Sequence, residues 1–356
     1  MASTLRRVLA APFATRTASG CSNRTARKRG TGVSSAHGRP RALASILLPV
    51  LLAGSACASA SKPEASSPEP SPTVTAAFPV TVAATNGAVS IKHRPLRIVS
   101  LSPTATEMLF AIDAGSQVVA VDDDSNYPPQ APMTKLSGFQ PNVEATAKYT
   151  PDLVVISNDT GNLTKSLQAL SIPVLLEPAA ASLDDTYSQI QQLGVATGHV
   201  ADAAGLVASM KSQIQQLVAS EPTFSHPLTY YHELDQTYYT ATSKTFIGKV
   251  YSLLGLKNIA DQAKGATSGY PQLSAEYIIK ANPDVILLAD TKCCGQSLKT
   301  VSKRPGWDEV TAVRWGVVVA LDDDVASRWG PRVVDFVRTV VQALTELEPK
   351  LQSASP

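Results

Sequence analysis

Aromatic and charged side chains follow several of the predicted strands in this chain, at the end of each strand where α/β sheets form their ligand crevice. The candidate ligand-binding residues are Asp124, Tyr127, Phe139 and Asn158 in the first half of the body, and Tyr239, Tyr270, Asp324, Arg328 and Trp329 in the second half. Rings supply contact area, and a few charged groups fix the orientation of a ligand. The mixture suits non-covalent binding of a large, partly planar molecule.

The residue patterns of common catalytic sites do not occur in the sequence, which has no phosphate loop, nucleophile elbow or HExxH zinc motif. The histidines of the body, His93, His199, His226 and His232, lack the spacing of metal ligands. The run 322–324 is acidic, but it lacks the alternating ligand spacing of a calcium loop. We therefore predict a protein that is not an enzyme and has no catalytic residue, metal or cofactor. An exported hydrolase is a remote alternative, which turnover would reveal.

A motif that occurs twice indicates the elements that position these residues. Glu144 stands seven residues before Pro151-Asp152, and Glu276 stands seven residues before Pro283-Asp284, 132 positions further along the chain. In each copy a short amphipathic segment leads through Pro-Asp into an unbroken apolar run, which is typical of a helix, a turn and a strand that is buried on both faces. The repeat predicts two similar α/β halves with a binding cleft between them.

Hydrophobic periodicity places further elements in both halves. The predicted strands are 97–102, 118–121, 154–157 and 174–176 in the first half, and 228–232, 285–289 and 317–321 in the second; the predicted helices are 104–114, 245–254 and a closing helix 328–347. The segment 183–220 contains no proline and has helical spacing, so part of it could form a long helix that links the halves. The alternative is a pair of ordinary surface helices of one domain.

Charge is distributed unevenly along the chain. The formal net charge is +2, but residues 1–56 hold nine Arg and Lys and no acid, which leaves 22 basic against 29 acidic residues, a net −7, in the remainder. A mildly acidic body is a poor partner for nucleic acid.

The basic start of the chain is typical of an export signal. Arg39 and Arg41 precede the apolar stretch 42–53, which is too short for a bilayer span of roughly 20 residues. The small residues before Cys57 resemble the lipobox of bacterial lipoproteins, which predicts lipidation of Cys57, with ordinary cleavage as the alternative. Residues 1–38 exceed what such a signal needs, which indicates a translation start set too early. Residues 58–77 are rich in Ser, Pro and Ala and are predicted to form a disordered tether.

Cys293 and Cys294 are the two cysteines of the predicted body, in an oxidising compartment if the protein is exported. Neighbouring Cα atoms are about 3.8 Å apart, below the usual separation of about 4.4–6.8 Å across a disulfide. A strained vicinal disulfide that forms an apolar lip on the cleft is one hypothesis. Free thiols and metal ligation are the alternatives.

Several segments together resemble the helical-backbone family of substrate-binding proteins that serve ABC importers of cobalamin and ferric siderophores. The resemblance covers residues 92–349, and the segments that carry it are 97–107, Asn126-Tyr127-Pro128-Pro129, the Pro151-Asp152 strand, Tyr270-Pro271-Gln272-Leu273-Ser274 and Arg328-Trp329-Gly330-Pro331-Arg332. The family implies the class III periplasmic-binding-protein fold, in which two Rossmann-like α/β lobes with mainly parallel sheets are joined by one long backbone helix.

The resemblance also implies a function for the repeated glutamates. In the family, one surface Glu on each lobe docks onto arginines of a symmetric permease dimer, which works with a cytoplasmic ATPase, and Glu144 and Glu276 match those positions. Carboxylate and guanidinium form directional, charge-assisted pairs. The simpler alternative is that each Glu only favours the first turn of a helix. We expect a monomer that is tethered outside the cell membrane by its lipid.

The family further implies a ligand class. The Asp324/Arg328 pair matches the cobalamin type, and Phe139, Tyr239 and Tyr270 keep aromatic character, whereas Asp124 and Asn158 replace aromatic residues of cobalamin binders. We predict capture of cobalamin or a related corrinoid, with a ferric siderophore or haem as the alternative. The predicted organisation is an export signal 1–57, a tether 58–77, a first lobe 78–182, a helical region 183–221 and a second lobe 222–356.

Overall fold

The computed structural model describes residues 77–353, so the predicted export signal, Cys57 and nearly all of the predicted tether lie outside the described residues. Within the described range, none of the helices has the length and apolar character that crossing a membrane requires. The domain boundaries remain predictions.

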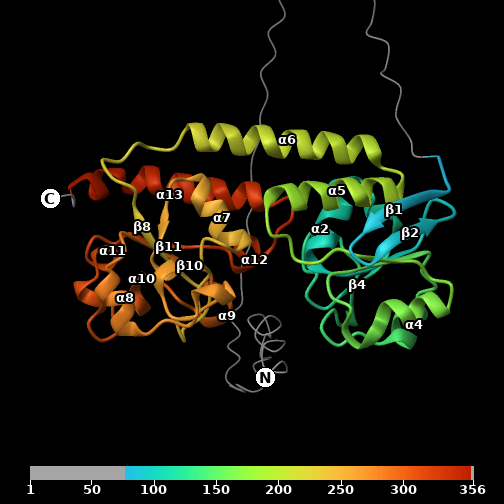
Figure 1. Ribbon diagram of the computed structural model, residues 1–356, viewed down its shortest axis with the longest axis horizontal. Helices are drawn as coiled ribbons and strands as arrows, with labels where there is room; N and C mark the ends of the chain where they lie inside the picture. The colour runs from blue at the N-terminus through green and yellow to red at the C-terminus, as the bar shows by residue number, and fades with distance from the viewer. Residues whose placement is uncertain (1–76, 354–356) are drawn as a thin grey trace, which may run out of the picture. The chain divides into compact units, whose positions relative to one another are not determined.

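The first lobe is built on a five-stranded parallel sheet (Figure 1). The strand order is β5 (Met133–Leu136), β4 (Val118–Asp122), β3 (Ile98–Leu101), β6 (Leu153–Ile156) and β7 (Val174–Leu176). Successive residues of a strand face opposite sides, and β6 is buried on both. Val154 and Ile156 join one apolar cluster, while Leu153 and Val155 join the larger cluster that continues into the second lobe.

Helices and one hairpin surround this sheet. They are β1 (Val80–Ala84), β2 (Gly87–Ile91), α2 (Pro103–Ala111), α3 (Val143–Ala147) and α4 (Leu163–Ala169). The α2 helix begins where the sequence predicts, because Ser102 caps it by accepting a hydrogen bond from Ala105 N–H and Pro103 occupies its first turn. The antiparallel hairpin was not predicted.

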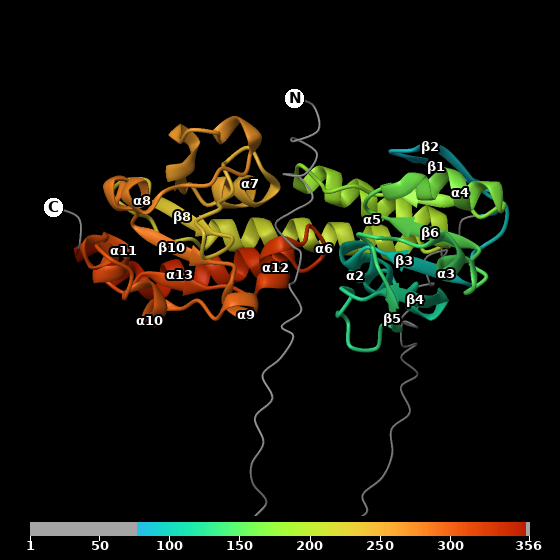
Figure 2. The same cartoon turned by 90° about the horizontal axis from the view of Figure 1, so that it is seen from below.

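The second lobe is built on a four-stranded parallel sheet. Its strand order is β11 (Val318–Ala320), β10 (Val285–Leu288), β8 (Thr229–Glu233) and β9 (Lys257–Asn258). Its helices are α7 (Phe246–Leu253), α8 (Ala275–Ala281), α9 (Thr291–Cys294), α10 (Leu298–Val301), α11 (Thr311–Arg314), α12 (Asp323–Ser327) and α13 (Val333–Ser353). In both views the elements of this lobe form a group separate from β3, β4 and α2 (Figures 1 and 2).

The two sheets share a strand order. Reading β4-β3-β6-β7 in the first lobe and β9-β8-β10-β11 in the second, the strand that follows the repeated Pro-Asp occupies the same place, and β5 is an addition to the first lobe. The predicted α/β class with two mainly parallel lobes is confirmed.

The repeated Pro-Asp has the same structural role in both lobes. Asp152 Oδ2 accepts hydrogen bonds from the backbone N–H groups of Leu96 (2.9 Å) and Arg97 (3.0 Å) at the start of β3. Asp284 Oδ2 accepts from the N–H of Thr229 (2.8 Å) and from its hydroxyl (2.7 Å) at the start of β8. Each aspartate therefore fixes the strand beside its own strand.

The backbone just before this Pro-Asp is also repeated. Thr150 has φ 44° and Asn282 has φ 47°, and the two positions are 132 residues apart. A left-handed residue is uncommon outside glycine, so its recurrence at matched positions marks a turn that both lobes need before the buried strand.

Two helices link the lobes. The predicted helical segment divides into α5 (Leu183–Thr197) and α6 (Val200–Ala219), because Gly198 at φ 81° ends α5. The α6 helix packs against α5 along one part of its length and against α13 along the other, so it spans both lobes (Figure 1). At about 1.5 Å per residue its 20 residues are about 30 Å long.

The start of the closing helix was predicted wrongly. The prediction began at Arg328, but α12 ends at Ser327 and α13 begins at Val333. Pro331 disfavours a helical conformation in the residue before it, and Arg328 has extended backbone angles (φ −108°, ψ 136°). The segment 328–332 is therefore a loop, which frees its arginines to reach the other lobe.

Candidate functional site

The predicted ligand-binding residues lie beyond the carboxyl ends of the strands in both lobes. In the first lobe, Asp124 and Tyr127 follow β4, Phe139 follows β5 and Asn158 follows β6. Asn158 is exposed, as are the rings of Tyr127 (42%) and Phe139 (43%). Water-exposed aromatic rings at this edge provide apolar area that a ligand could cover.

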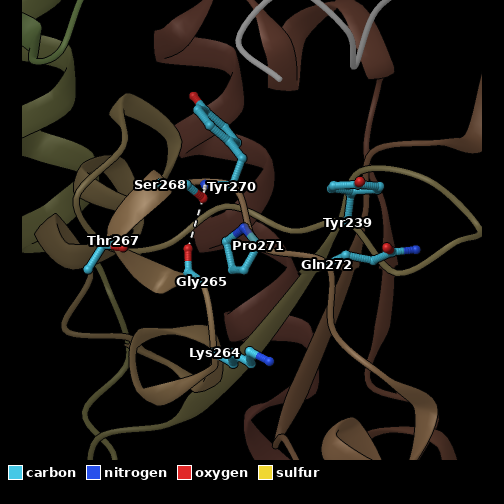
Figure 3. Close-up of a pocket in the computed structure, with 8 residues that line it drawn as sticks. All are labelled: Tyr239, Lys264, Gly265, Thr267, Ser268, Tyr270, Pro271 and Gln272. Atoms are coloured by element: carbon cyan, nitrogen blue, oxygen red, sulfur yellow. Dashed lines mark hydrogen bonds between the residues drawn. The ribbon is translucent and has the colours of Figure 1, made fainter. Parts of the chain in front are cut away.

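In the second lobe, two tyrosines line an open pocket. Tyr239 and Tyr270 lie on either side of Pro271, with Lys264 and Gln272 completing the wall (Figure 3). The pocket has a volume of about 440 Å³. Tyr239 forms an antiparallel bridge with Gln272, which joins the loop after β8 to the segment before α8. The bridge therefore fixes the backbones of the two loops that carry Tyr239 and Tyr270 relative to each other.

A buried ion cluster joins the lobes. Glu107, on α2 of the first lobe, is 3% exposed. Its Oε1 accepts from Arg328 Nη1 (2.8 Å) and Arg332 Nη2 (2.5 Å), and its Oε2 accepts from Arg332 Nε (2.9 Å). A buried carboxylate loses the water that solvated it. The two guanidinium groups compensate for that loss, because they donate hydrogen bonds to both carboxylate oxygens. We define Glu107, Arg328 and Arg332 as the interlobe cluster.

Arg328 makes further bonds that leave little of its guanidinium free. Its Nη2 donates to the backbone oxygen of Asp124 (3.0 Å), to Asn126 Oδ1 (2.9 Å) and to Asp324 Oδ1 (3.1 Å). Asn126 Nδ2 also donates to Asp324 Oδ2 across the lobes (3.2 Å). Arg328 thus acts as a connector between lobes, and its predicted ligand contact stays a prediction.

Tyr127 and Trp329 also belong to the junction between lobes. The Arg332 guanidinium lies 4.2 Å from the centroid of the Tyr127 ring, a favourable cation–π position. Trp329 donates from its indole N–H to Gln189 Oε1 (3.0 Å), and its backbone oxygen accepts from the Thr186 hydroxyl (2.9 Å). Five of the nine predicted residues are therefore tied to the junction: Asp124, Tyr127, Asp324, Arg328 and Trp329. The other four, Phe139, Asn158, Tyr239 and Tyr270, present side chains at the strand ends.

The acidic residues at this edge have pKa values that are shifted in opposite directions. Burial raises the pKa of Asp122, the last residue of β4, to about 7, although a hydrogen bond from Ser125 opposes the shift. For Asp324 burial acts in the same upward direction, but the charges of Arg328 and Lys292 prevail and lower the pKa. Lys292 Nζ lies 2.8 Å from Asp322 Oδ2 and 3.0 Å from Asp324 Oδ2. The 322–324 run is thus largely neutralised by protein cations.

Glu144 and Glu276 occupy equivalent helix positions. Glu144 is the second residue of α3 after its cap Asn142, and Glu276 is the second residue of α8 after its cap Ser274. Both side chains are exposed. Hydrogen bonds from the backbone N–H of Glu276 itself and from the Ser274 side chain lower the pKa of the Glu276 carboxyl. Each lobe therefore offers one matched surface carboxylate, and docking to a permease remains a prediction.

The vicinal disulfide is absent from the structure. Cys293 and Cys294 are exposed free thiols in the helical turn α9. Consecutive side chains of a helix diverge by about 100°, which keeps the two sulfurs from bonding. Asp323 holds this turn by accepting from the N–H groups of Lys292 (2.9 Å) and Cys293 (3.0 Å). Partial desolvation of the thiol, together with the neighbouring Cys294, raises the pKa of Cys293, which disfavours the reactive thiolate.

Within residues 77–353, no group of three or more His, Cys, Asp and Glu side chains is arranged to hold a metal ion. His232 is fully buried, and burial lowers its pKa to about 3, so it is neutral.

Sequence reasoning missed the role of Glu107 and the whole of Arg304. Glu107 interrupts an apolar helix face beside Met108 and Leu109, and an acid in such a place needs a buried cation. Arg304 binds the Glu233 carboxylate through both terminal nitrogens, at 2.6 Å each. Glu233 directly follows the strand predicted at 228–232, and an acid that becomes buried at a strand end needs a partner.

Comparison with known proteins adds to this geometry. A family model described as periplasmic binding protein matches residues 98–325. An uncharacterized ABC transporter substrate-binding lipoprotein of Bacillus subtilis is 33% identical over 281 residues, which cover 76% of this chain and 87% of the relative. A cobalamin-binding protein of Halobacterium salinarum is 33% identical over 276 residues, which cover 75% of this chain and 74% of the relative.

Among solved structures, a protein of Staphylococcus epidermidis described as a possible iron-binding, periplasmic solute-binding protein superposes with a TM-score of 0.62. It is 27% identical, and the match covers 71% of this chain and 99% of that protein. The family model extends from the first strand of the first sheet into α12, so it includes strands of both lobes.

Proposed function

Since the chain belongs to the periplasmic binding protein family, we propose that it captures cobalamin or a related corrinoid and delivers it to the permease of an ABC importer. The family consists of extracytoplasmic solute-binding proteins, which carry a ligand rather than transform it. The choice of a corrinoid, the lipid anchor at Cys57 and the monomeric state are parts of the proposal.

One observation carries the choice of ligand. The three arginines described near the strand ends, Arg304, Arg328 and Arg332, are each paired with a carboxylate of the protein. An anionic ferric siderophore would have to compete with Glu107 or Glu233 for them, at the cost of leaving a buried carboxylate unpaired. A large ligand without strong net charge can instead cover the rings of Phe139, Tyr239 and Tyr270.

The cobalamin-binding relative supports the same choice, because its identity to this chain extends over three-quarters of both proteins. The alternative is a ferric siderophore or haem, which the likeness to the iron-binding solved structure favours.

Calorimetric titration of the purified protein with cyanocobalamin, haem and several ferric siderophores tests the proposal. We expect one corrinoid bound per protein, with an affinity about tenfold weaker in the Tyr239→Leu variant, which keeps an apolar side chain but loses the ring. Trp315→Leu is the matched control, because Trp315 is a partly exposed ring that precedes β11 and so lies at the opposite strand end. Tighter binding of an anionic siderophore than of cobalamin would refute the corrinoid.

Docking through the two glutamates has its own test. We expect Glu144→Ala combined with Glu276→Ala to abolish ligand uptake by cells while leaving ligand affinity unchanged, with either single variant less impaired. Glu309→Ala, at another exposed glutamate of the second lobe, is the control. Normal uptake by the double variant would show that these carboxylates do not dock.

A further inference from the structure

A buried charged group lies under the ends of β8 and β10. Glu233 ends β8 and Asp290 follows β10, and both are 0% exposed. Arg304 donates from Nη1 to Glu233 Oε2 and from Nη2 to Glu233 Oε1, at 2.6 Å each, and Nη2 also donates to Gln296 Oε1 at 2.7 Å. This two-pronged geometry fixes the plane of the guanidinium.

Asp290 is a second buried carboxyl group beside the Arg304–Glu233 pair. Burial, followed by the nearby Glu233 charge, raises the pKa of Asp290 to about 8, so Asp290 holds a proton at neutral pH. Glu233 is the carboxylate that pairs with Arg304, at 2.6 Å.

The fixed guanidinium supports two aromatic rings. Arg304 lies 4.6 Å from the ring centroid of Trp307 and 5.4 Å from that of Tyr238. The Tyr238 and Trp307 rings are stacked, with centroids 5.8 Å apart and planes 25° apart. Trp307 is fully buried, so it cannot shift without disturbing the core of the lobe. Arg304 and Trp307 therefore form a rigid support for Tyr238.

The backbone of Tyr238 needs that support. Its φ of 71° is a left-handed conformation that a bulky side chain adopts only when its surroundings impose it. Tyr238 N–H donates to the oxygen of Asp235 (3.0 Å), and Tyr238 O accepts from Leu273 N–H (3.0 Å). The stacked ring and these two bonds together hold the turn.

This turn sets the position of the next residue, Tyr239, which lines the pocket of Figure 3. We propose that Arg304 is a positioning residue: by holding Tyr238 on Trp307, it sets the direction in which Tyr239 meets the ligand. The inference rests on the proposed function, because it assumes that Tyr239 contacts the transported molecule.

A double variant, Arg304→Met with Glu233→Gln, tests the inference. The single Arg304→Met change would leave Glu233 buried without its cation and could prevent folding, whereas the double change removes both charges. Arg304→Lys keeps the charge but lacks the planar group that spans both rings. Arg338→Met is the matched control, because Arg338 pairs with Asp335 on the surface of α13.

Two measurements on the full chain decide the outcome. Hydrogen exchange of the backbone amides in 234–240 reports the turn without any ligand, and calorimetry with cyanocobalamin reports binding. For the double variant we expect about tenfold faster exchange in 234–240 and about tenfold weaker binding, with exchange in β3 and β6 unchanged. Arg304→Lys should recover part of both losses, and Arg338→Met should change neither.

Unchanged exchange in 234–240 of a folded double variant would overturn the positioning role, whatever the ligand result. Faster exchange with unchanged affinity would overturn it as well, because Tyr239 would then move without consequence for the ligand. If the unaltered protein binds no corrinoid, haem or siderophore, the proposed function fails and the inference fails with it.

Discussion

The two lobes share the arrangement of their strands but differ in the side chains at their strand ends. Both have the same strand order and the same aspartate that fixes the neighbouring strand. At the strand ends, however, the first lobe is lined inside by small hydroxyls, with Thr106 between Ser100 (2.9 Å) and Ser125 (3.0 Å). The second lobe packs rings and ion pairs there.

The contrast is strongest in the core of the second lobe. Its largest fully buried side chains are Tyr230, Tyr231, Tyr251, Trp307 and Phe336. The strand order and the aspartates Asp152 and Asp284 are common to both lobes, whereas the side chains at the strand ends differ. The second lobe therefore has an aromatic core, whereas the aromatic rings at the strand ends of the first lobe, Tyr127 and Phe139, are exposed.

The largest expected effect comes from removing what joins the lobes. Glu107→Ala leaves Arg328 and Arg332 with side chains 10% and 16% exposed and without their shared anion. We expect the free energy of unfolding to fall by about 3–5 kcal/mol, measured by urea denaturation. Asp335→Ala, which removes the surface partner of Arg338, should cost about 1 kcal/mol or less. Equal costs for the two variants would mean that the interlobe cluster does not hold the lobes together.

The next effect is a dependence of stability on pH, to which buried carboxyls of both lobes contribute. Burial raises the pKa of Glu177, just after β7, to about 8, while an unfolded glutamate titrates near 4.5. Between these values the unfolded chain loses the proton and the folded protein keeps it. The stability that protonated Glu177 contributes is therefore fully present below the unfolded pKa and is lost as pH rises toward about 8.

Asp122 in the first lobe, with a pKa near 7, and Asp290 in the second, near 8, contribute in the same direction. Unfolding free energies measured from pH 5 to pH 8 should decline, and Glu177→Gln should remove one proton's share of the slope. Glu309→Gln, at an exposed position, should leave the slope as it is. A stability that is flat over this range would contradict the protonated state of these carboxyls.

The smallest effect compares the two copies of the Pro-Asp support. Asp284 is half-buried and binds Thr229 through both the backbone and the hydroxyl, whereas Asp152 is exposed. We expect Asp284→Ala to cost about 2 kcal/mol and Asp152→Ala about 1 kcal/mol, measured by thermal unfolding. A larger cost at Asp152 would show that the two copies no longer share one structural role.

Much of the fold could be predicted from the sequence, because apolar runs and their Pro-Asp turns are local signals. The strands β6, β7 and β10 lie within a residue of their predicted positions, and the helix α6 lies inside the predicted helical segment 183–220. The two-residue β9 and the polar β5, Met133–Leu136, have too little apolar pattern to be recognised. The start of the closing helix was misplaced because the prediction continued the helix through Gly330 and Pro331, which disfavour a helical interior, whereas α13 begins at Val333.

The site could be predicted only in part. Strand ends identify which residues gather at one edge, but they do not tell which of these bind one another. Arg328 and its partner Glu107 are 221 positions apart, and no spacing rule connects them. Sequence reasoning therefore could not foresee that a protein carboxylate holds Arg328, and its contact with a ligand stays a prediction.

The tryptophans are distributed unevenly between the two lobes. The three indoles of the protein, Trp307, Trp315 and Trp329, all lie beyond residue 300, in the second lobe and its link to the first. Tryptophan emission therefore does not report on the interior of the first sheet. A change in the tryptophan spectrum on adding a solute would report events in the second lobe and its link to the first. A single indole introduced at Phe139, which is 43% exposed, would give the other side a signal of its own.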